Sequence, residues 1–192
     1  MRLELLRKIF HIVSILLLLV PLKLFGKFSV TILMFLMLLI FFPISYFRIK
    51  NKLTYPFWKL LEYVERQQNW ETIPGKQAFS LAVGLIIVSL LFSEKELEVA
   101  IISTAIYDGV ATIVGKLFGK HKIPFTKKSV EGTVAGIIIN SLFLLLILPV
   151  WKSIFISVIV ALVELMAKSE RWYLDDNILI PIVSAITYSL IS

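Results

Sequence analysis

The chain has 192 residues, of which 58% are hydrophobic, and a formal net charge of +7. With a mean hydropathy of +0.90, this composition excludes an ordinary soluble domain and indicates an integral membrane protein. The absence of cysteine excludes disulfides and thiolate metal sites, and in such an apolar chain the positive charge mainly reflects topology and not nucleic acid binding.

Seven apolar segments predict transmembrane helices, because a backbone in lipid must satisfy its own hydrogen bonds. They extend approximately over residues 9–25, 28–47, 77–92, 99–118, 133–150, 153–167 and 178–191. Three of them, residues 77–92, 153–167 and 178–191, are shorter than the lower limit of roughly 17 residues for a spanning helix, so we expect these to be tilted, broken or recessed. The sequence thus predicts an all-α, polytopic transmembrane bundle of about seven helices that forms one domain, residues 1–192.

The longest polar segment, residues 48–76, separates the second and third apolar segments. Within it, Thr54 can cap a helix and Pro56 can start one. Apolar residues then follow at helical spacing, namely Phe57, Leu60, Leu61 and Val64. This pattern predicts an amphipathic helix that lies at the membrane interface.

Basic residues are distributed unequally between the two sets of connections. Sixteen of the 20 lysines and arginines lie before the first apolar segment or in the connections after the second, fourth and sixth. The other four are Lys23, Lys27, Lys95 and Lys152. The positive-inside rule therefore predicts a cytoplasmic N-terminus, and it places the polar clusters described below on the cytoplasmic side of a multi-pass protein.

Asp108 lies near the middle of the fourth apolar segment. A carboxylate at the centre of a spanning helix costs roughly 2.5 to 3.5 kcal/mol on insertion scales, and it usually serves an ion, a substrate or a partner group. Mg²⁺ typically takes one or two protein carboxylates and completes its shell with phosphate oxygens and water. We therefore expect Asp108 to bind a metal ion, and a role as catalytic base is the alternative.

The connection after Asp108 is rich in glycine and lysine. Glycine lets backbone N–H groups approach phosphate, lysine neutralises it, and a helix N-terminus attracts anions. The candidate nucleotide-binding residues are Gly115, Gly119, Lys120, Lys127, Lys128, Ser129, Gly132 and Thr133, with Glu131 among them as a candidate acid. The spacing of a Walker loop is missing. Close helix packing is the alternative role for the glycines, and topology is the alternative explanation for the lysines.

Two further polar clusters lie near the ends of the chain. Close to the N-terminus, one helical face presents Glu4, Arg7, Lys8 and His11, either as interfacial ion pairs or as part of a site. Near the other end, Glu164 is a second carboxylate in an apolar segment, and Asp175, Asp176 and Asn177 open the last one. One of these three residues can cap a helix. Because adjacent acids repel, we expect Asp175 and Asp176 to share a metal ion with Asp108.

The order of these blocks resembles the dolichol kinase, phytol kinase and CTP-dependent diacylglycerol kinase family. The matching residues are Glu4-x-x-Arg7-Lys8-x-x-His11, Glu65-Arg66 with Pro74-Gly75-Lys76, Asp108-x-x-Ala111 with Gly115 and Gly119, Lys128-Ser129-x-Glu131-Gly132-Thr133, and Glu164 with Asp175-Asp176-Asn177-x-x-x-Pro181. The resemblance implies transfer of the terminal phosphate of CTP to the hydroxyl of a membrane lipid, with Mg²⁺ as the cofactor. Asp108, Lys128 and Glu131 are then the candidate catalytic residues, and Arg7, Lys8 and His11 join the candidate nucleotide site.

Two other functions remain open from the sequence. A phosphatidate cytidylyltransferase-like CDP-lipid synthase also uses CTP at a membrane, but its C-terminal His-Gly-Gly and Asp-Arg signature is absent and no glycine follows Gly136. A small membrane transporter could also place Asp108 and Glu164 in the membrane, yet it gives no reason for the run of lysine, serine and glycine. The lipid acceptor is an isoprenoid alcohol or a diacylglycerol-type lipid, and Gly132 with Gly136 could support a homodimer as well as internal packing.

Overall fold

The computed structural model describes residues 2–65, 67–124, 126, 128–167 and 175–192, with side chains omitted for residues 2, 3, 67 and 68. Among the residues that it describes, helices alternate with short connections and no β-strand forms, apart from an isolated bridge between Lys122 and Ser129. The elements are α1 (Arg2–Leu16), α2 (Leu19–Phe25), α3 (Lys27–Tyr46), α4 (Tyr55–Val64), α5 (Gln67–Trp70), α6 (Lys76–Leu91), α7 (Glu94–Ser103), the π-helix η1 (Thr104–Asp108), α8 (Gly109–Leu117), α9 (Val130–Leu144), α10 (Val150–Met166) and α11 (Asp176–Ile191). The prediction of an all-α protein is confirmed.

Each of the seven predicted apolar segments coincides with one helix or with two or three consecutive helical elements. In the described part of the chain, three helical stretches are long and apolar enough to cross a membrane, namely Glu4–Phe25, Lys27–Tyr46 and Glu94–Leu117. The helices Lys76–Leu91, Val130–Leu144 and Asp176–Ile191 are apolar but shorter. Membrane character is therefore confirmed, whereas seven spans and the orientation of the chain stay predictions.

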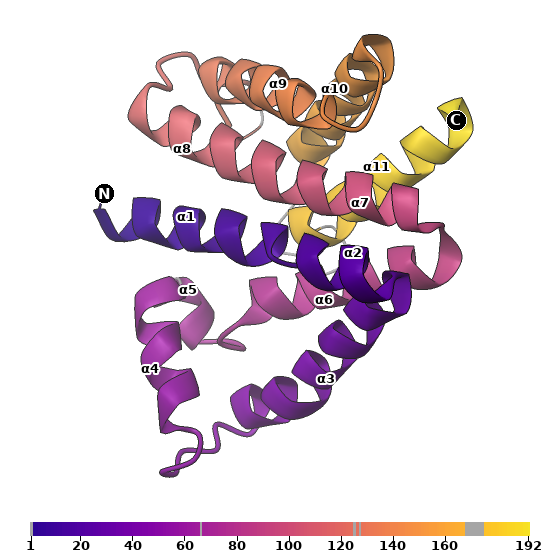
Figure 1. The fold of residues 1–192 in the computed structure, drawn as a ribbon. Coiled ribbons are helices and arrows are strands. Elements are labelled where there is room, and N and C mark those ends of the chain that lie inside the picture. Colours follow the sequence, from indigo (N-terminus) through magenta and orange to yellow (C-terminus); the bar gives the residue numbers. More distant parts are fainter. Residues whose placement is uncertain (1, 66, 125, 127, 168–174) are drawn as a thin grey trace.

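The three long stretches differ in how deeply they lie within the protein. About 78% of the apolar window in Glu94–Leu117 is buried, against 17% in Lys27–Tyr46. Figure 1 shows the consequence: α7 and α8 run through the middle of the molecule, α1 and α6 lie on one side of them, and α9 and α10 lie on the other. The helix that carries Asp108 is thus the central one, and α3 presents an apolar surface suited to acyl chains.

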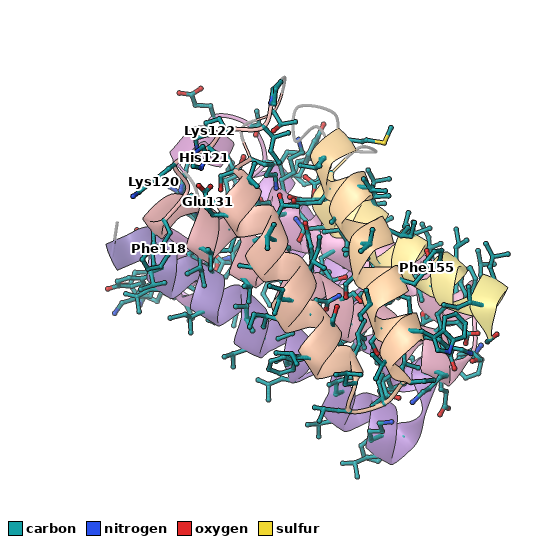
Figure 2. The ribbon with its side chains drawn as sticks, turned by 90° about the horizontal axis from the view of Figure 1, so that it is seen from above. Phe118, Lys120, His121, Lys122, Glu131 and Phe155 are labelled. Atoms are coloured by element: carbon teal, nitrogen blue, oxygen red, sulfur yellow. The ribbon has the colours of Figure 1, made fainter. Side chains whose placement is uncertain are left out.

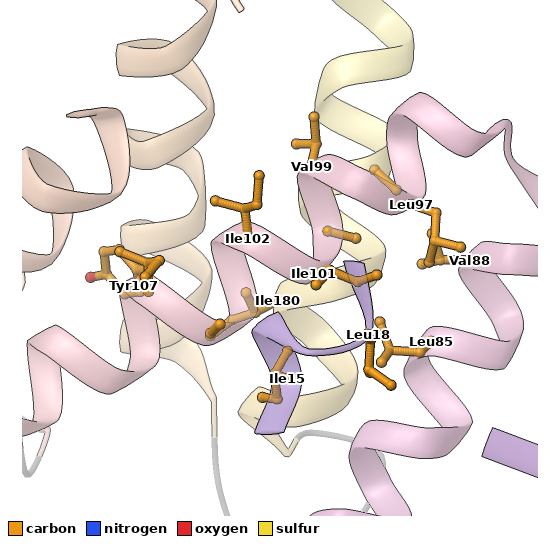
Figure 3. Close-up of a cluster of buried hydrophobic side chains, with 14 of the residues drawn as sticks. Ile15, Leu18, Leu85, Val88, Leu97, Val99, Ile101, Ile102, Tyr107 and Ile180 are labelled. Carbon is orange, nitrogen blue, oxygen red and sulfur yellow. The ribbon is translucent and has the colours of Figure 1, made fainter. Parts of the chain in front are cut away.

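Large aliphatic side chains fill the space around the central helix. Figure 3 shows this cluster, in which Ile15 of α1, Leu85 of α6, Ile101 of α7 and Ile180 of α11 are almost completely buried. Within a bilayer, the lipid tails are as apolar as these side chains, so packing and polar contacts decide which helices associate. Close approaches between backbones therefore matter more in this core than buried apolar area.

The closest approach between α8 and α9 depends on glycine. A Cβ atom at Gly132 would lie 2.5 Å from the carbonyl oxygen of Ala111 and 2.9 Å from the Cα of Gly115. One turn further along α9, a Cβ atom at Gly136 would lie 2.9 Å from the ring of Tyr107. Gly115 and Gly132, two of the candidate nucleotide-binding residues, thus have a packing role, and their contact with phosphate stays a prediction.

Replacing Gly132 by alanine should separate α8 from α9. The added methyl group would meet backbone atoms of Ala111 and Gly115, which cannot rotate away, so we expect a loss of roughly 1–3 kcal/mol in the free energy of unfolding. Thermal unfolding of the purified protein in detergent measures this loss. As a control, Ile138→Ala alters an exposed position of the same helix and should change stability by only about 0.5 kcal/mol. Equal stability of Gly132→Ala and wild type would contradict the tight crossing.

The predicted amphipathic helix is present as α4, Tyr55–Val64, with Pro56 in its first turn. Thr54 precedes it as predicted, but its hydroxyl donates to the carbonyl of Ile49 at 2.8 Å and does not cap the helix. The buried face of α4 carries Trp58 and Leu61. The indole N–H of Trp58 also donates to the Ile49 carbonyl, at 2.8 Å. Its place at the membrane interface stays a prediction.

Candidate functional site

Asp108 ends a local distortion of the central helix. Residues Thr104–Asp108 form a π-helical turn, and such single turns within α-helices are rare and occur often at functional sites. The extra residue in the turn rotates the side chains that follow it. Only 2% of Asp108 is exposed. Gly109 comes next, and a Cβ atom there would lie 2.3 Å from Ile12, so the glycine lets α1 pass close to this turn.

Two bases from α1 reach the Asp108 carboxylate. Lys8 Nζ lies 2.7 Å from Oδ2, and His11 Nε2 lies 3.2 Å from the same oxygen. The hydroxyl of Thr112, one turn further along, donates to the other oxygen, Oδ1, at 3.3 Å. Lys8 itself is 7% exposed. The buried charge that the sequence left unexplained therefore has two basic partners about 100 residues away in the chain.

The other two members of the N-terminal cluster form ion pairs of their own. Arg7 and Lys116 both form ion pairs with the carboxylate of Glu4, one from the same helix and one from α8. The four residues of this face of α1 thus form two separate sets of contacts. Lys8 and His11 join the buried site, whereas Glu4 and Arg7 link α1 to the end of α8.

A second cluster of opposite charges lies beside the first. Lys128 forms a close ion pair with Glu164 of α10, and its Nζ lies 3.8 Å from Oδ2 of Asp176. The hydroxyl of Tyr107 donates to the other oxygen of Glu164 at 3.4 Å. Since Tyr107 directly precedes Asp108, adjacent residues of the π-turn contact the two clusters. The structure thus brings together Lys8, His11, Asp108, Lys128, Glu164 and Asp176 from four predicted blocks.

The Lys128 ammonium is held in its charged form. Burial alone would lower the pKa of Lys128, but the carboxylates of Glu164, Asp176 and Asp108 outweigh this effect and raise the pKa above its ordinary value. A lysine that stays protonated among acids is a suitable partner for an anion that displaces one of them.

The start of α11 is the third part of the site. Asp175 caps this helix, because one of its carboxylate oxygens accepts hydrogen bonds from the backbone N–H of Asn177 at 3.0 Å and from its side-chain amide at 2.9 Å. Burial and the neighbouring Asp176 carboxylate raise the pKa of Asp175 to about 6. A cation would oppose both effects. Within the described part of the chain, the buried Oδ1 of Asn177 has no hydrogen-bond partner and adds an unused oxygen beside these acids.

The predicted metal ligands do not form a single preformed group. Within the described ranges, nowhere do three or more histidine, aspartate or glutamate side chains gather in a way that could hold a metal ion. Asp108 faces Lys8 and His11, Asp176 faces Lys128, and Asp175 is occupied as a cap. This arrangement fits a Mg²⁺ ion that takes one or two carboxylates and is otherwise held by phosphate oxygens. Mg²⁺ binding stays a prediction.

The connection between α8 and α9 carries an exposed polar group. Figure 2 shows Lys120, His121, Lys122 and Glu131 together at this end of the molecule, with Phe155 away from them on α10. Glu131 lies 2.6 Å from His121 Nδ1. Its own backbone N–H, together with the ring and backbone N–H of His121, lowers the pKa of Glu131 to about 2. These contacts lie outside the ion pairs of Asp108, so a catalytic role of Glu131 stays a prediction.

The turn before α9 has a defined geometry. Ser129 caps the helix by accepting a hydrogen bond from the backbone N–H of Gly132 at 3.2 Å. A Cβ atom at Gly119 would lie 2.6 Å from the Ser129 hydroxyl, and one at Gly115 would lie 2.9 Å from it. The glycines therefore enclose Ser129 and bring Lys128 to the inner side of the turn. Thr133 follows on the buried side of α9, next to Tyr107.

The remaining predicted residues lie in a separate loop before α6. Glu65 accepts hydrogen bonds from the backbone N–H of Gly75 and from the side chain of Asn69, and the Ser45 hydroxyl donates to the carbonyl of Pro74. Gly75 adopts a φ of +85°, which favours glycine, and Lys76 begins α6. These contacts give the block a structural role in fixing the loop. Arg66 and Lys127 lie outside the described residues.

Two residues that contact the buried carboxylates were not among the predicted site residues, namely Tyr107 and Thr112. Tyr107 is completely buried, and a phenol in an apolar segment needs a hydrogen-bond partner. Thr112 follows Asp108 at the spacing of one helical turn. Both residues could have been predicted from the sequence, because Tyr107 is adjacent to Asp108 and Thr112 follows it at the spacing of one helical turn.

Comparisons with known proteins give a partial match. No family model matches the chain, and no solved structure matches it. An uncharacterized protein of Methanocaldococcus jannaschii is 36% identical over 114 residues, which cover 58% of this chain and 56% of that protein. The dolichol kinase of Schizosaccharomyces pombe is 34% identical over 103 residues, which cover 48% of this chain and 19% of the kinase. The chain thus spans about half of the first relative and a fifth of the second, and the match supports a distant polyprenol-kinase-like relationship.

Proposed function

We propose that this protein is a CTP-dependent lipid kinase, which transfers the γ-phosphate of CTP to the hydroxyl of a membrane isoprenoid alcohol or diacylglycerol-type lipid. The observation that carries the proposal is the meeting of two charge clusters at the π-turn. Asp108 with Lys8 and His11 lies beside Lys128 with Glu164 and Asp176. The partial match to a dolichol kinase supports a kinase-like activity on a lipid.

Phosphoryl transfer needs positioning and charge neutralisation more than covalent chemistry. Lys128 would bind the terminal phosphates, with the cap of Ser129 and the start of α9 supplying backbone N–H groups. Asp108 and Asp176 would hold Mg²⁺, which supplies charge neutralisation at the phosphate oxygens when it is bound. Lys8 and His11 would then balance the charge of Asp108 on the side away from the nucleotide.

A carboxylate beside the acceptor must take up the proton of the hydroxyl. Asp108 is buried at the junction of the clusters, whereas the contacts of Glu131 are with His121 at the surface. If Asp108 does not bind the metal ion, its position therefore suits the alternative role of catalytic base better than that of Glu131. In the predicted orientation the site faces the cytoplasm, where CTP is available, and the lipid arrives laterally from the bilayer.

The experiment that tests this function follows two phosphates of CTP separately. Membranes containing the protein are incubated with Mg²⁺, native lipid extract and CTP labelled at either the γ- or the α-phosphate. We expect the γ-label in the lipid, and mass spectrometry of that product identifies the acceptor. Transfer of the α-label together with cytidine would establish a CDP-lipid synthase instead. Solute movement that depends on a gradient, with no nucleotide turnover, would establish a transporter.

A further inference from the structure

A pocket opens between α1 and α8, beside the Asp108 carboxylate. Its volume is about 290 Å³, near the lower end of the range of roughly 300–1,000 Å³ for small-molecule sites. The residues that line it are Glu4, Leu5, Lys8, Thr112, Ile113, Lys116 and Leu117. It therefore combines a few polar groups with aliphatic walls, which is typical of a site for an amphiphilic ligand.

The inner wall of the pocket contacts Asp108 directly. Lys8 and Thr112 both line the pocket, and each forms a hydrogen bond with the Asp108 carboxylate, at 2.7 and 3.3 Å. A small polar group that contacts Lys8 or Thr112 would thus be separated from the Asp108 carboxylate by a single side chain.

The charges in the pocket favour a neutral ligand. Of its two lysines, Lys8 is paired with Asp108 and Lys116 is paired with Glu4. A triphosphate would meet no surplus of positive charge here, and it would lie against two carboxylates. A hydroxyl, which both donates and accepts hydrogen bonds, fits Thr112 and its neighbours without that repulsion.

The outer wall is continuous with the apolar surface of the protein. Leu5 and Leu117 line the pocket and are 36% and 42% exposed. Further exposed apolar side chains follow on the same helix or directly after α8, namely Ile9 and Phe10 of α1 and Phe118. In a stretch that is apolar enough to cross a membrane, this surface is suited to acyl or isoprenoid chains. A lipid can therefore place its polar end inside and its tail along α1 and α8.

We propose that the pocket between α1 and α8 is the acceptor site, which binds the hydroxyl end of the lipid alcohol while the chain leaves over Leu5 and Leu117. The proposal rests on the proposed function. The alcohol then reaches Asp108 past Lys8 and Thr112, and the nucleotide reaches the site past Lys128. Separate entries for acceptor and donor are compatible with the in-line displacement of phosphoryl transfer.

The test compares two neighbouring leucines of α1. Leu5→Trp places an indole in the pocket, whereas Leu6→Trp adds the same side chain at a position that is 61% exposed and outside the pocket. We expect Leu5→Trp to raise the KM for the lipid alcohol about tenfold through overpacking, with the KM for CTP unchanged. Leu6→Trp should leave both values within about twofold. An increase in the KM for CTP would assign the pocket to the nucleotide and overturn the proposal.

A binding experiment separates this proposal from the kinase activity. A long-chain alcohol that carries a photoreactive diazirine next to its hydroxyl is cross-linked to the wild-type protein without nucleotide, and the labelled peptides are mapped. We expect label on α1 and α8, lost in Leu5→Trp and retained in Leu6→Trp. Label elsewhere in an active enzyme would overturn the pocket and leave the kinase in place. Label in the pocket of a protein that transfers no phosphate would support the pocket and overturn the kinase.

Discussion

Asp108→Asn should abolish the transfer of phosphate to lipid while the protein still inserts into the membrane. The amide neither holds a cation as a carboxylate does nor takes up a proton, so we expect a loss of about 10³-fold in kcat, near the upper end of what single electrostatic groups contribute. Incorporation of the γ-label from CTP into lipid measures the loss. Near-normal activity would remove Asp108 from the mechanism.

The same substitution also affects stability, because it leaves Lys8 as a buried charge without its carboxylate. Breaking a buried ion pair from one side costs about 3–5 kcal/mol, so a loss of activity alone would be ambiguous. The double variant Lys8→Met with Asp108→Asn removes both charges. We expect its thermal stability to return toward that of the wild type and its activity to remain absent. Recovered activity in the double variant would show that Asp108 serves only to neutralise Lys8.

Glu98 offers a matched control on the same central helix. Its carboxylate is also buried and pairs with Lys23 at 2.7 Å and with Lys95 at 3.2 Å, but it lies toward the opposite end of that helix. Glu98→Gln should lower stability through the loss of these ion pairs and leave kcat within about twofold of the wild-type value. The contrast between two buried carboxylates of one helix separates a catalytic contribution from a structural one.

The elements and the central charge could be predicted from the sequence, because both depend on local properties. Apolar runs identify the helices, and a single carboxylate among them identifies Asp108. The basic partners of Asp108 could not be derived in the same way, because Lys8 and His11 lie on another helix about 100 residues away in the chain. The π-turn Thr104–Asp108 also rotates the residues before it relative to those after it, and a pattern of 3.6 residues per turn does not contain that shift.

The acids near the C-terminus show a second reason why partners are hard to predict. Asp175, Asp176 and Asn177 are adjacent in sequence, yet Asp175 caps α11 while Asp176 turns toward Lys128. Which residue takes the cap depends on where the helix begins, a boundary that composition fixes only within a few residues. The glycines of the α8–α9 connection are similar, since close packing and phosphate binding both require a position without a side chain.

Lys128→Met should weaken the use of CTP far more than the loss of any exposed lysine. The ammonium is surrounded by Glu164, Asp176 and Asp108, which raise its pKa, so it carries its charge throughout the neutral range. Without it, Glu164 and Asp176 would lose this basic partner beside the phosphates, and we expect a fall of about 10²-fold in kcat/KM for CTP. Steady-state kinetics at varied CTP measure this fall. Lys122→Met, at an exposed lysine of the same connection, should stay within about threefold.

A second variant tests the ion pair between Lys128 and Glu164. The carboxylate of Glu164 is only 1% exposed, and Lys128→Met would leave it without the ammonium that pairs with it. Adding Glu164→Gln removes the stranded charge, so stability should recover while the use of CTP does not. The sign of the pH dependence gives an independent check. Because the folded-state pKa of Lys128 is raised, the stability that its charge contributes is present at neutral pH and is lost only as the pH rises through that pKa in the alkaline range. If Lys128 instead serves packing alone, Lys128→Met would keep its activity, and the difference in stability between the variant and the wild type would not change as the pH rises into the alkaline range.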